Sequence, residues 1–262
     1  MAVRKSLALA IAVAGASGPM AFLGTSSPAL AAGAAPIPAG PYIYGAGGGG
    51  WFHQDQCCGS LTIASTSTIT EVIIGDGSYN LSGGLVGGGV GYNFVQGNWV
   101  LGLEADDSWS GISGSGTCGF NSAFPHGCGG DIRWLATVRG RLGWDMGPIL
   151  TGYGDTLVYA TGGLAVGDVH AWDSLFGTSG DKTATGWTVG AGIETMLAPN
   201  WSVKVEYLHV DLGNPAVFSA IPPIPEHVST EGDIVRAGLT YYFNAPPPPM
   251  PPVITKAPRV TK

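Results

Sequence analysis

Histidine and cysteine occur close together in two segments of the sequence. "HQDQCC" contains His53, Cys57 and Cys58, and "CGFNSAFPHGC" places His126 two residues before Cys128. Imidazole and thiolate groups at such spacings are ligands for metal ions and haem iron. His53, Cys57, Cys58 and His126 are therefore weak candidates for binding a metal ion or haemin. A polar loop, held in one case by a disulfide, is the simpler interpretation.

A third segment, "HAWDS", contains His170, Asp173 and Ser174, the residue types of acyl-transfer sites. Such a site is recognised by geometry, and three polar types within five positions arise readily by chance. An enzyme that modifies membrane lipids is therefore the weakest functional alternative. We assign no catalytic residue and expect no cofactor.

Charged residues are rare, with 11 Lys or Arg and 18 Asp or Glu in 262 residues. Seven of them stand at alternating positions in otherwise apolar segments: Glu104, Arg139, Arg141, Glu194, Lys204, Glu206 and Arg236. The carboxylates could act as general acids or bases, but basic partners are available for each. We interpret the set as a structural charge network, with a narrow polar pore as the alternative.

The elements that carry these charges alternate with period two, as β-strands do. In "DIRWLATVRGRLGW" one face holds Ile132, Trp134, Ala136, Val138, Leu142 and Trp144, and the other holds Arg133, Thr137, Arg139 and Arg141. Residues 99–109, 186–197, 201–212 and 235–243 alternate in the same way. Glycine-rich residues 41–52, 81–95 and 156–169 add three weaker segments. The sequence therefore predicts eight strands, near the roughly nine to eleven residues that cross a bilayer.

Two features favour a membrane barrel over a soluble sandwich, which remains the alternative. Aromatic residues bracket the apolar rows, as interfacial girdles do, and the opposite faces carry charges that could pair in a narrow lumen. Short turns alternate with long links at about 54–80, 110–130, 170–182 and 213–232. We therefore expect an all-β, up-and-down antiparallel eight-stranded transmembrane β-barrel, with the long links as external loops.

The two ends of the chain differ in composition from this region. Residues 1–31 have a basic start, an apolar middle and a small-residue "ALA", the layout of a secretory signal that is removed on export. We expect a linker over 32–40, the barrel over 41–243 and a proline-rich tail over 244–262. Loss of Arg4 and Lys5 changes the formal net charge from −7 to −9, so we expect no nucleic-acid partner.

Export permits disulfides, and Cys118 with Cys128 is the pairing candidate. The pairing of Cys57 and Cys58 stays open, because a bond between adjacent cysteines is strained.

Four stretches, "VRGRLGW" (138–144), "GWTVGAGIE" (186–194), "WSVKVEYLHVDLG" (201–213) and "VRAGLTYYF" (235–243), resemble the outer-membrane surface-antigen family of alphaproteobacteria. The resemblance extends from about residue 42 to 243. It implies an opacity-protein-like, OmpA-type eight-stranded barrel in the outer membrane, with structural, adhesive or immunogenic roles. Some relatives are described as binding haemin.

The last strand ends in Tyr241 and Phe243, and we expect these aromatic residues to form a signal for the outer-membrane assembly machinery. The following "APPPPMPP" cannot continue a sheet and predicts an extended spacer. By topology that tail lies in the periplasm, where it could contact peptidoglycan or a periplasmic protein; a disordered end is the simpler interpretation.

Taken together, these patterns predict an integral outer-membrane surface protein with a structural and surface-interaction role. Its expected partners are membrane lipid, lipopolysaccharide (bridged by divalent cations to acidic loops) and host or other surface ligands. A haemin or small-ligand receptor acting through the loops, and a narrow pore, are the alternatives.

Overall fold

The computed structural model describes residues 35–64, 69–120, 124–174, 177–221 and 224–244. The expected signal peptide, residues 1–31, and the expected proline-rich tail, residues 244–262 except for Asn244, lie outside this part of the chain. Of the expected linker, residues 35–39 are described. No helix within the described residues is long and apolar enough to cross a membrane.

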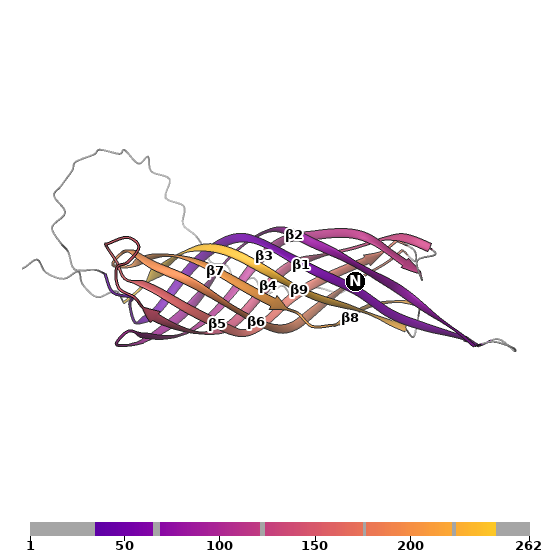
Figure 1. Ribbon diagram of the computed structural model, residues 1–262, viewed down its shortest axis with the longest axis horizontal. Coiled ribbons are helices and arrows are strands. Elements are labelled where there is room, and N and C mark those ends of the chain that lie inside the picture. The colour runs from indigo at the N-terminus through magenta and orange to yellow at the C-terminus, as the bar shows by residue number, and fades with distance from the viewer. Residues whose placement is uncertain (1–34, 65–68, 121–123, 175–176, 222–223, 245–262) are drawn as a thin grey trace, which may run out of the picture. The chain divides into compact units, whose positions relative to one another are not determined.

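The described chain forms antiparallel strands that close into a barrel (Figure 1). The strands are β1 (Gly40–Ala64), β2 (Ile69–Gln96), β3 (Trp99–Phe120), β4 (Phe124–Asp145), β5 (Thr156–Asp173), β6 (Thr178–Ala198), β7 (Trp201–Asp211), β8 (Ala216–Ile221) and β9 (Ile224–Tyr242). Each of β1 to β7 pairs with the next, β7 pairs with β9, and β9 pairs with β1. The predicted ring of eight antiparallel strands is confirmed, and the short β8 pairs with β9 outside it.

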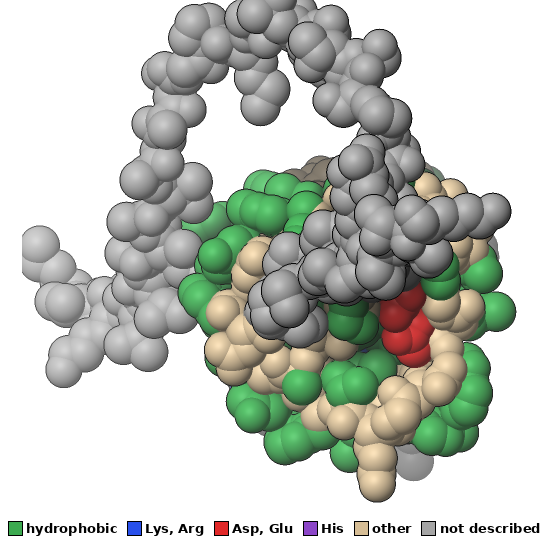
Figure 2. Space-filling model, turned by 90° about the vertical axis from the view of Figure 1, so that its left-hand side faces the viewer, with side chains coloured by type: hydrophobic (Ala, Val, Ile, Leu, Met, Phe, Trp, Pro, Cys, Tyr) green, Lys and Arg blue, Asp and Glu red, His purple; other side chains and the backbone are tan. Residues whose placement is uncertain are grey.

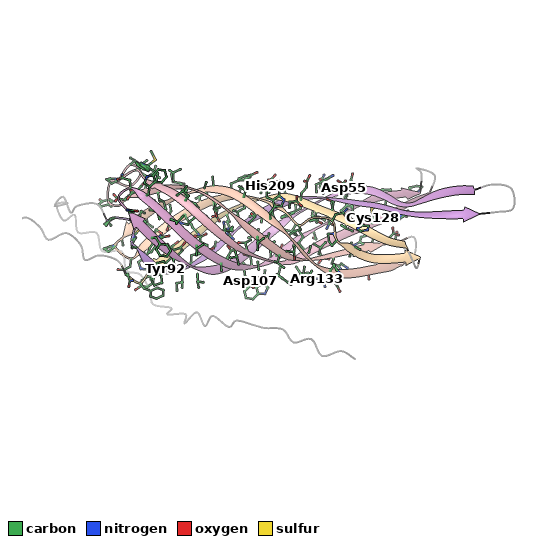
Figure 3. All side chains as sticks on the ribbon, turned by 90° about the horizontal axis from the view of Figure 1, so that it is seen from below. Asp55, Tyr92, Asp107, Cys128, Arg133 and His209 are labelled. Atoms are coloured by element: carbon green, nitrogen blue, oxygen red, sulfur yellow. A yellow bond between two sulfur atoms is a disulfide. The ribbon has the colours of Figure 1, made fainter. Side chains whose placement is uncertain are left out.

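Strand length differs from the prediction. β1 to β6 run for 18 to 28 residues each, whereas about nine to eleven residues cross a bilayer. The prediction of loops is therefore wrong for most of the long links. In the first of them, β1 continues from Gln54 to Ala64 and pairs as a hairpin with β2, which starts at Ile69. Figures 1 and 3 show that hairpin extending beyond its neighbours. In the described part of these extensions, outward positions such as Asp55 and Asp181 are polar, so the apolar alternation that marks a strand is lost there.

A bulge in β4 corrects the predicted faces of two residues. The register between β4 and β5 shifts between Ile132 and Leu135. The register between β3 and β4 shifts at the same level, between Trp109 and Ile112. One extra residue reverses the alternation, so Ile132 is buried in the interior while Arg133 points outward. Thr137, Arg139 and Arg141 stay inside, as expected.

The outer wall is apolar and bounded by aromatic residues. Leu101, Leu103, Val138 and Leu142 are more than half exposed on it. Trp99 and Trp144 pack edge to face at 4.7 Å, as do Trp201 and Tyr241 at 5.0 Å. An apolar exterior flanked by aromatic girdles is what a bilayer requires of a barrel.

The interior has three layers. We call the end with the connections at 97–98, 146–155 and 199–200 the turn end, and the opposite end the loop end. An apolar layer at the turn end includes Ile37, Leu157 and four tyrosines, and a larger apolar layer near the loop end includes Phe52, Leu81 and Ile132. Charged side chains lie buried in the barrel between them.

Inward glycines on β2 make room for this filling. A Cβ at Gly91 would overlap the Tyr42 ring, and one at Gly89 would overlap Tyr44 and Asp106. β2 therefore contributes backbone rather than side chains at this level, which fits the narrow interior of an eight-stranded barrel.

Candidate functional site

The buried charges in the middle layer form one connected set, which we call the luminal network. Its carboxylates are Glu104, Asp106, Glu194 and Glu206, and its cations are Arg139, Arg141, Lys204 and Arg236. These residues come from β3, β4, β6, β7 and β9, and all are at most 7% exposed. Period-two alternation in each strand directs them to the same side of the sheet.

Arg139 is the most connected cation. Its guanidinium lies 2.9 Å from Glu206, 3.0 Å from Glu104 and 2.8 Å from Asp106. Arg141 joins Glu104 at 3.0 Å to Glu194 at 2.8 Å. Each guanidinium thus holds together carboxylates from different strands, which only a planar group with several donors can do.

Tyrosines complete the coordination of the carboxylates. The hydroxyl of Tyr42 donates to Glu104 at 2.8 Å, that of Tyr44 to Asp106 at 2.9 Å and that of Tyr242 to Glu194 at 2.6 Å. The ammonium of Lys204 also lies 3.4 Å from the centre of the Tyr44 ring. Asp106 was not among the predicted network residues, although its position two residues after Glu104 signals the same face.

Four carboxylates and four cations make the luminal network neutral by formal charge. Apolar layers lie on both sides of it, and the side chains of Glu104, Arg139 and Glu206 are 0% exposed. The arrangement can brace the barrel wall, because its ion pairs join neighbouring strands and also strands that are not neighbours, such as β4 with β7 through Arg139 and Glu206 and β9 with β3 through Arg236 and Asp106. It gives a substrate no access to the carboxylates.

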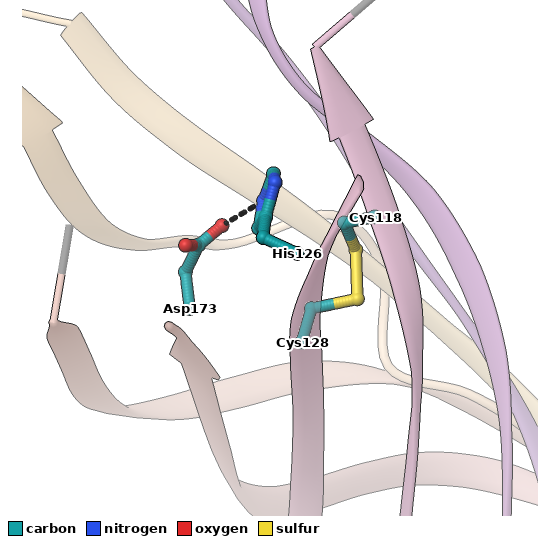
Figure 4. Close-up of a disulfide and its surroundings, with 4 residues drawn as sticks. All are labelled: Cys118, His126, Cys128 and Asp173. Atoms are coloured by element: carbon teal, nitrogen blue, oxygen red, sulfur yellow. Dashed lines mark hydrogen bonds and ion pairs between the residues drawn. A yellow bond between two sulfur atoms is a disulfide. The ribbon is translucent and has the colours of Figure 1, made fainter. Parts of the chain in front are cut away.

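A second polar cluster lies inside the barrel at the loop end (Figure 4). Cys118 and Cys128 form a disulfide with a Cα–Cα distance of 5.8 Å that joins β3 to β4. His126, within the linked hairpin, contacts Asp173 at the end of β5 through Nε2 at 2.9 Å. Both side chains are almost fully buried. The cluster fixes the β3–β4 hairpin to β5.

The acyl-transfer hypothesis for "HAWDS" is wrong in its geometry. Asp173 points inward to His126, whereas His170 contacts Asp181 on the outer surface at 2.8 Å. Alternation within β5 places His170 on the face opposite Asp173. The three residues therefore do not form one site.

The first candidate ligand segment, residues 53–58, is strand rather than loop. His53 faces outward and contacts Asn80 at 2.9 Å and Asp55 at 3.2 Å. The side chains of Cys57 and Cys58 lie outside the described part. Among the side chains that the structure describes, no group of three or more His, Cys, Asp or Glu is arranged to hold a metal ion.

At the turn end, hydrophobic side chains surround the rim and acidic side chains lie within it (Figure 2). Asp145 and Asp155 approach each other beside the connection between β4 and β5, and burial together with the Asp145 carboxylate raises the pKa of Asp155 to about 6. At this end Tyr241 and the half-exposed Phe243, the predicted assembly signal, pack edge to face at 5.3 Å.

Comparison with known proteins agrees with this architecture. Residues 20–243 match the family model "Outer membrane protein beta-barrel domain". The "31 kDa outer-membrane immunogenic protein" of Brucella melitensis is 38% identical over 170 residues, 62% of this chain and 68% of the relative. The "22 kDa outer membrane protein" of Rhizobium leguminosarum bv. viciae is 37% identical over 46% of this chain and 49% of that protein.

Solved structures are matched at low identity and with low TM-scores. Ail, the attachment invasion locus protein of Yersinia pestis, is 13% identical with a TM-score of 0.39, over 78% of this chain and 100% of Ail. Neisserial surface protein A is 12% identical with a TM-score of 0.39, over 78% of this chain and 98% of that protein. By the family match, which covers most of its length, this chain belongs to the outer-membrane protein β-barrel domain family and is an outer-membrane protein.

Proposed function

We propose that this outer-membrane protein acts at the cell surface through the part of its barrel that continues past the membrane. The observation that carries the proposal is the length of the strands, since β1 to β6 have 18 to 28 residues. Beyond the apolar wall their outward faces become polar, with Asp55, Arg133 and Asp181 exposed.

The projecting part is built to keep its shape. Its interior holds an apolar layer, and the disulfide and the His126–Asp173 contact tie β3, β4 and β5 together above it. A rigid, polar surface of this kind suits contact with other molecules. In outer-membrane barrels the short turns face the periplasm, so we assign the loop end to the outside.

Partners follow from this orientation. The names of the Brucella relatives describe immunogenic outer-membrane proteins, which supports a surface-antigen and adhesive role for this chain. Lipid and lipopolysaccharide surround the wall, and with the turn end in the periplasm the expected contact of the tail is peptidoglycan or a periplasmic protein. The buried luminal network supports a role that is structural rather than catalytic or conductive.

Orientation and exposure can be tested on intact cells with a membrane-impermeant maleimide. A cysteine at exposed Ser179 near the loop end should be labelled without lysis, whereas one at exposed Gln96 near the turn end should be labelled only after lysis. Fab fragments raised against the folded protein should bind the same cells and reduce their attachment to an extracellular-matrix coating. Labelling of Gln96→Cys alone on intact cells would overturn the proposal. Fab binding without any change in attachment would restrict the role to a surface antigen.

A further inference from the structure

A shallow groove runs along the lipid-facing wall where the first and last ring strands meet. It has a volume of about 430 Å³. Gly45, Gly47 and Ala237 form its floor, and Val86, Val203 and Leu239 line its sides. A Cβ at Gly45 would approach no atom closer than 3.9 Å. The groove is therefore an open, shallow depression with an apolar lining.

An aromatic and acidic cluster, which we call the headgroup cluster, lies on the same strands toward the loop end. It consists of Trp51, Tyr207, His209, Glu231 and Asp233. Asp233 is its centre: it pairs across the strands with Trp51 on β1 and with His209 on β7. The Tyr207 hydroxyl donates to Asp233 at 2.7 Å, and His209 Nδ1 lies 2.9 Å from the same oxygen.

Trp51 connects the cluster to the groove. A Cβ at Gly49 would lie 3.7 Å from the Trp51 indole, so this ring lies over the glycine floor just beyond the groove. On the far side, Trp187 packs against the His209 ring at 5.5 Å. Aromatic side chains therefore border the Asp233 carboxylate on both neighbouring strands.

The charge of this surface is one-sided. Among the described residues, the outward positions of β1, β7 and β9 carry four carboxylates (Asp55, Asp211, Glu231 and Asp233) and no Lys or Arg. His209 and Asp55 can be followed along this side in Figure 3. On the other side of the barrel, Arg133 neutralises Asp131 and Asp181 at 3.1 and 2.7 Å.

We propose that the groove and the headgroup cluster bind one membrane lipid whose headgroup carries a quaternary ammonium group. An acyl chain fills the apolar groove, and the ammonium group lies against Asp233 and Glu231 between the Trp51 and Tyr207 rings. Carboxylates and aromatic faces together are the groups that select quaternary ammonium ions. Along these strands the apolar groove is followed by the charged headgroup cluster, just as the acyl chain of a lipid is followed by its headgroup.

The test is lipid retention by the purified, refolded full chain in nanodiscs that contain equal phosphatidylcholine and phosphatidylglycerol. Native mass spectrometry should find one phosphatidylcholine retained on the protein. The double variant Glu231→Gln/Asp233→Asn should reduce that retention roughly tenfold, because it removes both carboxylates that face the ammonium group and leaves the aromatic rings in place. Gly47→Leu fills the groove and should reduce retention of both lipids.

Matched controls separate the site from general effects on the wall. Gly162 also faces outward, and a Cβ there would meet its neighbours at the same 3.5 and 3.9 Å as one at Gly47; Gly162→Leu should retain phosphatidylcholine. Asp181→Asn removes an outward carboxylate that Arg133 neutralises and should also leave retention unchanged. A gel-mobility shift on boiling verifies folding of every variant.

Equal retention of the two lipids by the unmodified protein would overturn the proposal. So would unchanged retention in both site variants, or a dimer that Gly47→Leu abolishes with no lipid bound, which would assign the groove to a second copy of the chain.

Discussion

Two arginines on one strand, six positions apart, illustrate how differently the barrel uses charge inside and outside. Arg139 is buried and contacts three carboxylates, whereas Arg133 is 41% exposed in its side chain and contacts Asp131 and Asp181 on the surface. Both have short ion pairs. The two arginines differ in their access to water, and this access decides how much each ion pair contributes to the stability of the barrel.

A buried charge that loses its partners cannot recover hydration, so breaking such a pair is costly even where its formation gained little. An exposed charge is hydrated again at once, and salt screens it. The luminal network should therefore control the stability of the barrel, and the outer ion pairs should mainly set its surface charge.

The largest effect should come from Arg139→Met. Three buried carboxylates would each lose one partner and the luminal network would hold one uncompensated negative charge, so the free energy of unfolding should fall by about 3–5 kcal/mol. Urea titration in detergent, followed by the gel-mobility shift, measures it. Arg133→Met is the matched control, with an expected loss of at most about 1 kcal/mol that shrinks at high salt. Equal losses in the two variants would remove the distinction between inside and outside.

The disulfide between Cys118 and Cys128 allows the loop end to be compared with the luminal network. Replacing Cys118 and Cys128 by serine opens a short loop and should cost about 2–3 kcal/mol. Because the disulfide lies above the luminal network, the cut sites gained in limited proteolysis should be confined to the loop end. New cuts at the turn end would contradict the separate layers.

Two tyrosines provide a finer comparison. Tyr42 donates to Glu104 inside at 2.8 Å, and Tyr207 donates to Asp233 outside at 2.7 Å. Tyr42→Phe should lower the free energy of unfolding by about 2 kcal/mol, the contribution of a buried hydrogen bond to a charged group. Tyr207→Phe should leave it unchanged within error. The same urea titration measures both, and a larger effect for Tyr207 would reverse the expectation.

The smallest effect concerns pH at the turn end. The raised pKa of Asp155, about 6, means that folding favours its protonated form. Its contribution to stability is complete below the ordinary carboxyl range and is lost as the pH rises through 6. Hydrogen exchange of the Met146 amide, which donates to Thr156, should therefore speed up across that range after correction for the intrinsic rate. Asp155→Asn should abolish the dependence.

Much of the barrel could be predicted from alternation within each segment. Where lipid faces one side and the lumen the other, as at Leu101 to Ala105 or Val203 to Tyr207, the two solvents impose opposite residue types at successive positions. Glu104, Arg139 and Arg236 could be placed inside for the same reason.

Other features depend on contacts between segments, and local patterns do not reveal them. The bulge near Ile132 adds one residue to the strand and reverses the faces of Ile132 and Arg133, although the letters "DIRW" alternate regularly. The described parts of the strand extensions carry polar outward residues such as Asp55 and Asp181, and these segments read as loops. The contact between His126 and Asp173 joins residues that are 47 positions apart, whereas local spacing suggested His170 as the partner.

The seam between β1 and β9 has a consequence for the order of folding. Tyr42 pairs with Tyr242 across 200 residues, and Arg236 on the last strand reaches Asp106 on the third. Neither the ring nor the luminal network is complete until the final strand arrives. Contacts between such distant residues form slowly, because the whole intervening chain must first be ordered. A chain that ended before β9 would keep two unpaired edges and unmatched acids inside, so the last strand decides whether the rest of the barrel can stay folded.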